Sequence, residues 1–169
     1  MRAVFFDRDG TLMEDAHYLA DPAGVRVYPG VREALARLRT AGWMVIVVSN
    51  QSGVARGLIT AEQHRAVHEE FLRQAGEIDG AYYCFDAPDA PSGCRKPAPG
   101  MVLEAAAGHA IDLGASWLVG DKAADIECGR RAGVRTIRVL TGYGSQQACD
   151  ADAVCAGAME AVSWILREG

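Results

Sequence analysis

The chain has 169 residues, of which half are hydrophobic, and its net charge at pH 7 is −5. This length suits one domain, residues 1–169, around a single hydrophobic core. The sequence has no basic stripe of the kind that binds nucleic acid, and no apolar run reaches the roughly twenty residues of a membrane span. Its five cysteines, with no secretion signal before them, predict a cytoplasmic protein with reduced thiols.

The first predicted element is a buried strand at residues 4–6, which ends at two carboxylates. Asp7 and Asp9 follow the apolar run, and Gly10 then lets the chain turn sharply. Open α/β sheets bind their ligands at the carboxyl ends of their strands. Two carboxylates that face one point need a cation or a shared proton, and Mg²⁺ prefers oxygen ligands. For an isolated D-x-D triplet, solvated side chains would be the better interpretation. The remaining motifs therefore decide whether Asp7 and Asp9 belong to a ligand site.

Residues 13–28 show no sustained period and predict a flap or an irregular hairpin. His17 and Tyr18 could face a substrate from this segment or could be ordinary surface residues. A helix follows at residues 31–39, because its apolar positions recur at helical spacing and Gly42 ends it. The continuous β-branched run at residues 44–48 is typical of a strand buried in a parallel sheet.

A polar segment, residues 49–53, stands at the end of this second strand. The Ser49 hydroxyl and the backbone N–H groups that follow it could donate to phosphate oxygens. A polar turn into the next helix would explain the same residues. Arg56 could bind a second anionic group or could simply be solvated.

The next helix is predicted at residues 61–75. Thr60 is its expected N-cap, and Gln63 is placed to complete a capping box. His64 and His68 lie one turn apart, a spacing that zinc sites use. Because no third ligand is evident nearby, we expect both to be surface histidines.

A third strand is predicted at residues 81–85, followed by a loop rich in proline and aspartate. Arg95 and Lys96 stand at the end of this loop. Lys96 could act as a point charge on a reacting phosphoryl group, whereas the planar fork of Arg95 better suits a more distant anion. The next helix is predicted from about residue 99 to residue 110.

The strand at residues 116–120 repeats the opening pattern, because it ends at Asp121, with Lys122 and Asp125 just beyond. Asp121 joins Asp7 and Asp9 at one sheet edge, and three carboxylates from two strands predict a Mg²⁺ site. A helix to residue 131, strands at 136–140 and 153–155, and a helix at 158–167 complete the chain. The fold expected is α/β, a doubly wound parallel sheet with minimal or no cap domain.

Four ordered motifs resemble those of haloacid dehalogenase (HAD) superfamily phosphatases: Asp7 to Thr11, Ser49 to Gly53, Lys96, and Gly120 to Lys122. The segments Ser49 to Gly57 and Cys94 to Pro97 are similar to those of the heptose-bisphosphate phosphatase family within it. The resemblance implies a Mg²⁺-dependent phosphomonoesterase that removes the 7-phosphate of D-glycero-D-manno-heptose 1,7-bisphosphate, in the synthesis of ADP-heptose and lipopolysaccharide core precursors. Histidinol-phosphate phosphatases share most of these motifs, so histidinol phosphate or another small sugar phosphate is the alternative substrate.

The resemblance also implies a role for each site residue. Asp7 would attack phosphorus and form an aspartyl-phosphate, and Asp9 would act as general acid and then as general base. Ser49 and Lys96 would stabilise charge on the phosphoryl oxygens. Mg²⁺ would be held by the Asp7 carboxylate, the Asp9 main-chain carbonyl and Asp121, while Asp125 would orient Lys96 or a metal-bound water. The residues expected to line the sugar-phosphate pocket are Asp15, His17, Tyr18, Asn50, Gln51, Ser52, Arg95 and Lys122, and Arg56 is assigned to the uncleaved phosphate from its charge alone.

The chain departs from the resembled family at one place. Heptose-bisphosphate phosphatases usually carry a zinc loop of the form C-x-H…C-x-C just before Arg-Lys-Pro. Here Cys84 and Cys94 remain, but Asp86 and Ser92 occupy the other two positions. Serine rarely ligates zinc, so we expect no structural zinc. A residual zinc held by Cys84, Asp86, Cys94 and water is the minority alternative.

A phospho-accepting domain of the two-component receiver type has similar ingredients and would act as a signalling switch. Receiver domains typically carry an adjacent acidic pair after the first strand and a phospho-accepting aspartate after a later strand. Here the D-x-D triplet follows the first strand, and Asp9 is a group that a turnover enzyme needs. The switch is therefore a distant alternative. We also expect a monomer whose partner is a small phosphorylated sugar, and we assign no role to Cys149 and Cys155.

Overall fold

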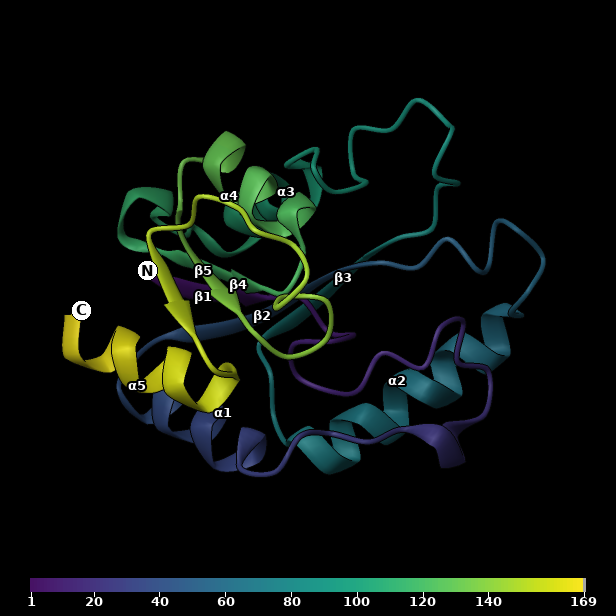
Figure 1. The fold of residues 1–169 in the computed structure, drawn as a ribbon, viewed down its shortest axis with the longest axis horizontal. Helices are drawn as coiled ribbons and strands as arrows, with labels where there is room; N and C mark the ends of the chain where they lie inside the picture. Colours follow the sequence, from purple (N-terminus) through teal and green to yellow (C-terminus); the bar gives the residue numbers. More distant parts are fainter. Residues whose placement is uncertain (169) are drawn as a thin grey trace.

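The computed structural model describes residues 1–168 and contains a six-stranded sheet between two layers of helices (Figure 1). The strand order is β3-β2-β1-β4-β5-β6, and every neighbouring pair is parallel. The strands are β1 (Ala3–Phe6), β2 (Met44–Asn50), β3 (Gly80–Cys84), β4 (Trp117–Gly120), β5 (Arg135–Val139) and β6 (Ala153–Cys155). The predicted doubly wound parallel sheet is confirmed, with strand boundaries shifted by one residue or two.

Helices cover both faces of this sheet (Figure 1). Helices α1 (Val31–Thr40), α2 (Ala61–Ala75) and α5 (Ala158–Glu168) pack on one face, and α3 (Gly100–His109) and α4 (Ala123–Ala132) pack on the other. Two short 3₁₀ helices, η1 (Pro22–Gly24) and η2 (Leu113–Ala115), lie in the connections. Within residues 1–168, none of these helices has the length and apolar character needed to span a membrane.

The central strand β1 is buried on both faces because its side chains alternate between two cores. Val4 and Phe6 belong to the core beneath α1, α2 and α5, while Ala3 and Phe5 belong to the core beneath α3 and α4. All four side chains are fully buried. This alternation is why the strand reads as an unbroken apolar run.

The prediction that His64 and His68 lie on the surface is wrong, although α2 has the predicted capping box. His64 is buried, and its ring meets those of Tyr83 and Phe85 edge-on at centroid distances of 4.6 and 5.0 Å. His68 is half-buried, with its Nδ1 2.7 Å from the Tyr83 hydroxyl. The end of β3 supplies the aromatic rings that cover this face of α2, so the histidines serve as packing side chains.

The order of the strands reverses between β1 and β4. Phe6 pairs with Val119 across these strands, and the Asp7 N–H donates to the Val119 carbonyl at 3.0 Å. Asp7 and Asp121 therefore leave neighbouring strands at the same edge. In open α/β sheets the crevice at such a switch point is where ligands bind.

Two connections extend beyond this edge of the sheet. Residues 11–30 form the predicted irregular hairpin, in which Met13 and Val27 make an antiparallel bridge. Residues 85–99 form the long loop between β3 and α3 that projects from the body of the protein in Figure 1. Neither segment is large enough to form a separate domain, so the cap over the crevice is minimal, as predicted.

Candidate active site

A buried lysine lies between two buried carboxylates at the switch point. Lys96 Nζ is 2.7 Å from Asp7 Oδ1 and 2.6 Å from Asp125 Oδ1, and it also donates to the Val48 carbonyl at 2.8 Å. Burial raises the pKa of Asp7, as does the charge of Asp125, while Lys96 lowers it. Burial lowers the pKa of Lys96, but Asp125 and Asp7 outweigh this effect and raise it above its usual value. Lys96 is therefore a fixed cation beside the Asp7 carboxylate.

Asp121 completes an acidic cluster around this lysine. One carboxylate oxygen from each of Asp7, Asp121 and Asp125 lies within 4.8 Å of the other two. Burial and the Asp7 charge raise the pKa of Asp121 to about 7. This shift indicates that repulsion between the crowded carboxylates is not fully balanced by nearby cations. A divalent cation with oxygen ligands would supply the missing positive charge. The donor set therefore fits Mg²⁺. Both oxygens of Asp125 are already engaged, Oδ1 by Lys96 Nζ and Oδ2 by the Lys122 N–H, so the side-chain ligands would be Asp7 and Asp121. We call these four residues (Asp7, Lys96, Asp121, Asp125) the phosphoryl centre.

The segment after β5 closes over Asp121. The Tyr143 N–H donates to Asp121 Oδ2 at 2.8 Å, and the Thr141 hydroxyl donates to the Gly10 carbonyl at 2.7 Å. A Cβ on Gly142 would lie 2.3 Å from Asp121 Oδ2, and Gly142 has a positive φ of 55°. Only glycine lets the backbone approach this closely.

Asp9 stands at the mouth of the phosphoryl centre, held by donors from two strand ends. Arg8 donates to both of its carboxylate oxygens, at 3.2 and 3.1 Å. Gln51 Nε2 donates to Asp9 Oδ2 at 2.6 Å and to the buried Ser49 hydroxyl oxygen at 2.9 Å. Gln51 thus links Asp9 with Ser49. Sequence analysis assigned no role to Arg8. The signal that could have found it is alternation along β1, because Val4, Phe6 and Arg8 lie two residues apart and the first two face α2.

Asn50 holds the backbone of Lys96 with both ends of its amide. Its Nδ2 donates to the Lys96 carbonyl at 3.1 Å, and its Oδ1 accepts the Lys96 N–H at 3.0 Å. The Asn50 amide therefore fixes the position of the Lys96 backbone within the loop after β3. Asn50 also lines the pockets described next, so its predicted contact with substrate stays a prediction.

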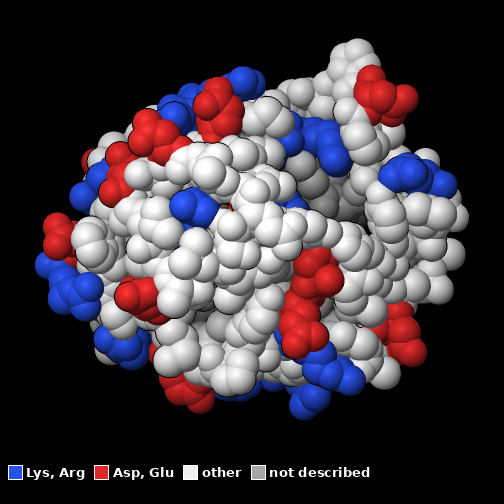
Figure 2. All heavy atoms as spheres, viewed as in Figure 1, with Lys and Arg blue, Asp and Glu red and all other residues white. Residues whose placement is uncertain are grey.

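Two adjoining pockets open at this edge, and Figure 2 shows a hollow with basic side chains at its rim in this part of the surface. The first has a volume of about 290 Å³ and is lined by Asp7, Asp9, Ser49, Asn50, Arg95, Lys96, Lys122, Ala124 and Asp125. The second, here called the distal pocket, has a volume of about 160 Å³ and is lined by Asp9, Asp15, His17, Tyr18, Asn50, Gln51, Ser52, Gly53 and Lys122. A larger hollow of about 620 Å³ between α1 and α2 lies away from these side chains.

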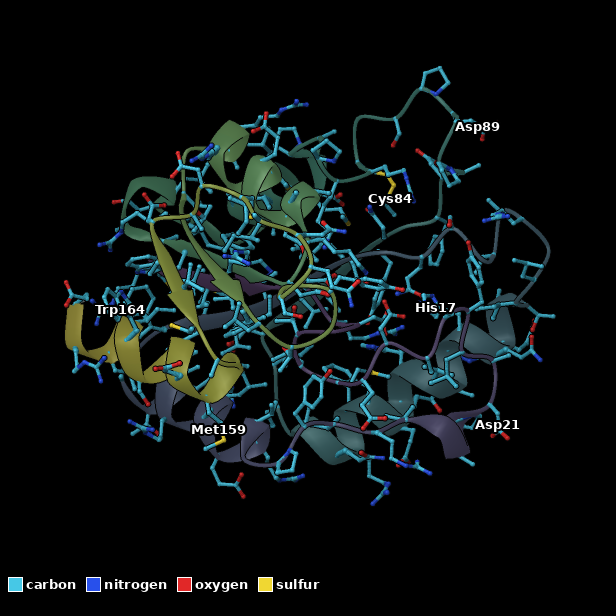
Figure 3. The ribbon with its side chains drawn as sticks, viewed as in Figure 1. His17, Asp21, Cys84, Asp89, Met159 and Trp164 are labelled. Atoms are coloured by element: carbon cyan, nitrogen blue, oxygen red, sulfur yellow. A yellow bond between two sulfur atoms is a disulfide. The ribbon has the colours of Figure 1, made fainter. Side chains whose placement is uncertain are left out.

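Loop contacts shape the distal pocket. Lys122 Nζ is 3.1 Å from Asp15 Oδ2, and the Tyr143 hydroxyl is 2.7 Å from His17 Nε2. His17, labelled in Figure 3, and Tyr18 both have positive φ, 47° and 50°. Such angles are strained for residues other than glycine, so the contacts must hold this turn in place. Sequence analysis did not find Tyr143, which reaches the turn from the far end of the chain.

Arg56 lies beside this pocket rather than in its wall. Its guanidinium contacts the Tyr18 hydroxyl and lies over the Tyr18 ring, 5.3 Å from the centroid. Arg56 is absent from the residues that line either pocket. Its assignment to the uncleaved phosphate stays a prediction.

The loop after β3 is closed by a Cys84–Cys94 disulfide, drawn at its base in Figure 3. This pairing corrects the expectation that all five cysteines are reduced; Cys128, Cys149 and Cys155 are free. The Ser92 hydroxyl lies 3.6 and 3.5 Å from the two sulfurs and accepts the Arg95 N–H at 2.9 Å. Asp86 Oδ2 lies 3.5 Å from the Cys94 sulfur. The disulfide therefore fixes the loop that carries Arg95 and Lys96.

Comparison with known proteins agrees with this geometry. A family model described as HAD-hydrolase-like matches residues 93–161. The D-glycero-D-manno-heptose-1,7-bisphosphate 7-phosphatase of Thermosynechococcus vestitus is 37% identical to the chain, over 96% of the chain and 94% of the relative. The D-glycero-beta-D-manno-heptose-1,7-bisphosphate 7-phosphatase of Yersinia pestis is 34% identical, over 98% and 89%.

Solved structures match over the same length. The D,D-heptose 1,7-bisphosphate phosphatase of B. bronchiseptica, complexed with magnesium and phosphate, superposes with a TM-score of 0.91 at 31% identity over 100% of both chains. The D,D-heptose 1,7-bisphosphate phosphatase of Burkholderia thailandensis gives a TM-score of 0.75 at 27% identity, over 98% and 99% of the chains. Because the chain is 34–37% identical to the Yersinia pestis and Thermosynechococcus vestitus phosphatases over nearly its full length, it belongs to the heptose-1,7-bisphosphate 7-phosphatase family of HAD phosphatases.

Proposed function

We propose that this protein removes the 7-phosphate of D-glycero-D-manno-heptose 1,7-bisphosphate in a Mg²⁺-dependent reaction, on the way to ADP-heptose and lipopolysaccharide core precursors. One observation carries the chemistry: the Asp7 carboxylate is buried at the switch point, 2.7 Å from Lys96 Nζ and beside Asp121. A carboxylate held by a fixed cation is suited to attack phosphorus. The substrate follows from the relatives' names.

In the first step, an Asp7 oxygen forms a bond to phosphorus as the bond from phosphorus to the sugar oxygen breaks. Asp9 gives its proton to that departing oxygen. In the second step, Asp9 takes a proton from water, which attacks phosphorus and releases phosphate and the free Asp7 carboxylate. Asp9 is suited to both steps because it lines both pockets.

Lys96 and Ser49 support both steps by stabilising charge on the phosphoryl oxygens. Asp125 keeps Lys96 in place through its 2.6 Å contact with Nζ. Mg²⁺, held by Asp7, the Asp9 main-chain carbonyl and Asp121, would supply positive charge that offsets repulsion between the nucleophile and the phosphate.

The distal pocket would hold the sugar and its uncleaved phosphate. Lys122 is suited to this task because it lies at the border of both pockets, where its cation faces either phosphate. Arg95 lines the first pocket and presents a planar fork to an anion. Asp15, His17, Tyr18, Gln51 and Ser52 would meet the sugar hydroxyls.

Phosphate release from a panel of heptose 1,7-bisphosphate anomers, other sugar phosphates and histidinol phosphate tests the proposal. We expect preference for the heptose bisphosphate, with the 7-phosphate released, and loss of turnover in EDTA. Preference for histidinol phosphate would keep the mechanism and reject the substrate. A stable phosphoprotein without turnover would favour the signalling switch instead.

We further propose that the chain is a single-domain monomer, works in the cytoplasm and binds no structural zinc. The zinc proposal follows from the donor set, since Ser92 replaces a thiolate and Cys84 and Cys94 are joined. Light scattering in solution tests the monomer, and fractionation of cells tests the location. One equivalent of zinc in protein purified without added metal would contradict the zinc proposal.

A further inference from the structure

Arg8 is a buried cation between the two aspartates of the D-x-D triplet, and no step above uses it. Only 2% of its surface is exposed. Its guanidinium carbon lies 5.6 Å from the centroid of the Tyr83 ring, and His64 stacks edge-on against that ring. The guanidinium thus lies beside the Tyr83 ring of β3, which in turn packs against His64 of α2.

Within residues 1–168, the salt bridge that Arg8 makes is with Asp9 alone. The neighbouring rings carry no charge at neutral pH. Burial and the charge of Arg8 lower the pKa of His64 to about 4, and burial raises the pKa of Tyr83, so the imidazole and the phenol are both neutral. Burial also acts to lower the pKa of Arg8, but Asp9 and, to a smaller extent, Tyr83 outweigh this effect, and the pKa is raised overall. The Arg8 charge therefore acts mainly on one carboxylate.

The contact fixes the direction of that carboxylate as well as its charge. Arg8 Nε and Nη2 donate to different oxygens of Asp9, which is the two-point geometry that sets the plane of a carboxylate. Gln51 adds a third bond to Oδ2. Arg8 is almost completely buried beside the Tyr83 ring, which restricts its movement. Its Nη1 is buried without a hydrogen-bond partner of good distance and angle within residues 1–168, so the two bonds to Asp9 are its principal hydrogen bonds.

We propose that Arg8 is the positioning residue of the general acid and base, holding the Asp9 carboxylate at the border of the two pockets where the departing sugar oxygen must lie. This inference rests on the proposed role of Asp9. A purely structural role would leave the arginine replaceable by an apolar side chain of similar size, since buried ion pairs are often no more stabilising than such a replacement.

The test compares two esters that differ in their need for an acid. A sugar phosphate has an alkoxide leaving group that must be protonated, whereas p-nitrophenyl phosphate releases a stable anion without help. Single-turnover cleavage with enzyme in excess measures this step alone. For Arg8→Met and for Arg8→Lys, which keeps the charge but loses the planar fork, we expect sugar phosphate cleavage to fall about 10-fold or more. Cleavage of p-nitrophenyl phosphate should fall less than about 3-fold.

The controls separate this inference from the proposed function. Asp9→Asn should show the same preference for the nitrophenyl ester, and Arg8→Met should cause no further loss in that background. Arg131→Met, which removes an exposed arginine paired with Glu127, should change neither ester. Equal losses on both esters in the Arg8 variants, or no loss on either, would overturn the inference. If Asp9→Asn shows no preference, the role of Asp9 fails, and the inference fails with it.

Folding of the variants is followed by thermal unfolding. Asp9→Asn leaves the buried guanidinium without a counter-charge and should lower Tm by roughly 5 °C or more. Arg8→Met in the Asp9→Asn background removes that unpaired charge and should recover part of the loss. No recovery would contradict the specific pairing on which the inference depends.

Discussion

The phosphoryl centre and the distal pocket lie on either side of Asp9, which lines both pockets, yet they are built differently. The residues of the phosphoryl centre are buried. Asp7 and Asp121 directly follow β1 and β4, and Asp125 lies in the first turn of α4. Lys96 lies on the loop after β3, where Asn50 holds its backbone. The distal pocket is lined by a strained turn at residues 17–18, held by loop contacts such as Tyr143 to His17. His17 and Tyr18 are both exposed.

This difference indicates that phosphoryl transfer depends on buried charged groups at the sheet edge, whereas substrate choice depends on exposed loop residues. A change at the phosphoryl centre should therefore lower both turnover and, where charge is left unpaired, stability. A change in the distal pocket should alter KM for the sugar phosphate while leaving the fold intact. The following variants test this division, beginning with the largest expected effect.

Asp7→Asn should abolish turnover, with a loss of at least about 10⁴-fold, because the amide cannot serve as the nucleophile. Phosphate release from heptose 1,7-bisphosphate measures the effect, and circular dichroism checks that the variant is folded. Residual activity within about 10-fold of the unmodified protein would mean that another group attacks phosphorus.

Lys96→Met should reduce both stability and turnover. It leaves Asp7 and Asp125 as buried carboxylates without their cation, which costs about 3–5 kcal/mol of unfolding free energy. The loss of charge beside the phosphoryl oxygens should lower kcat by about 10²-fold or more. Lys122→Met is the matched control for stability, since its lysine is one-third exposed and should cost under about 1 kcal/mol. Equal losses in urea unfolding would contradict the contrast between the regions.

Tyr143→Phe should act only on the distal pocket. It removes the hydroxyl bonded to His17 and keeps both the ring beneath Lys122 and the backbone N–H bonded to Asp121. A lost hydrogen bond of about 1 kcal/mol corresponds to a rise in KM of about 5-fold, with kcat nearly unchanged. Steady-state kinetics on the bisphosphate give the result, and a fall in kcat without a change in KM would contradict it.

The pH dependence of stability should distinguish metal-free from Mg²⁺-loaded protein. Asp121 has a pKa of about 7 in the folded state against 3.8 in the unfolded chain. Its raised pKa contributes stability that is fully present below 3.8 and is lost as the pH rises through about 7. Without metal, Tm should therefore fall between about pH 5 and about pH 8, and Mg²⁺ should raise Tm more at the higher pH. Asp121→Asn should weaken this dependence; an unchanged dependence would contradict the assignment.

The sequence predicts the strand ends well and the loops poorly, for a physical reason. The proximity of Asp7, Lys96 and Asp121 could be predicted from the sequence, because each follows a strand and parallel strands place their carboxyl ends at one edge. Continuous apolar runs and helical spacing of apolar residues likewise indicated the order of strands and helices, since strands are buried on both faces of the sheet and helices on one.

Contacts between loops carry no such periodic signal. Tyr143 meets His17 across 126 residues, and the Cys84–Cys94 pairing depends on how a proline-rich loop folds back. Arg8 was missed because an arginine between two aspartates usually indicates solvated charge. His64 was missed because the rings that bury it come from β3. In each case the contacting residue lies on another element, and the local sequence pattern does not show where that element lies in the fold.

Rapid chemical quenching of the Mg²⁺-loaded protein during turnover of heptose 1,7-bisphosphate tests the central claim most directly. The quenched protein is digested, and the site of phosphorylation is read by mass spectrometry. The account predicts phosphate on Asp7, formed at least as fast as steady-state turnover and absent in Asp7→Asn. Turnover without any phosphoprotein, or phosphate on a different residue, would contradict it.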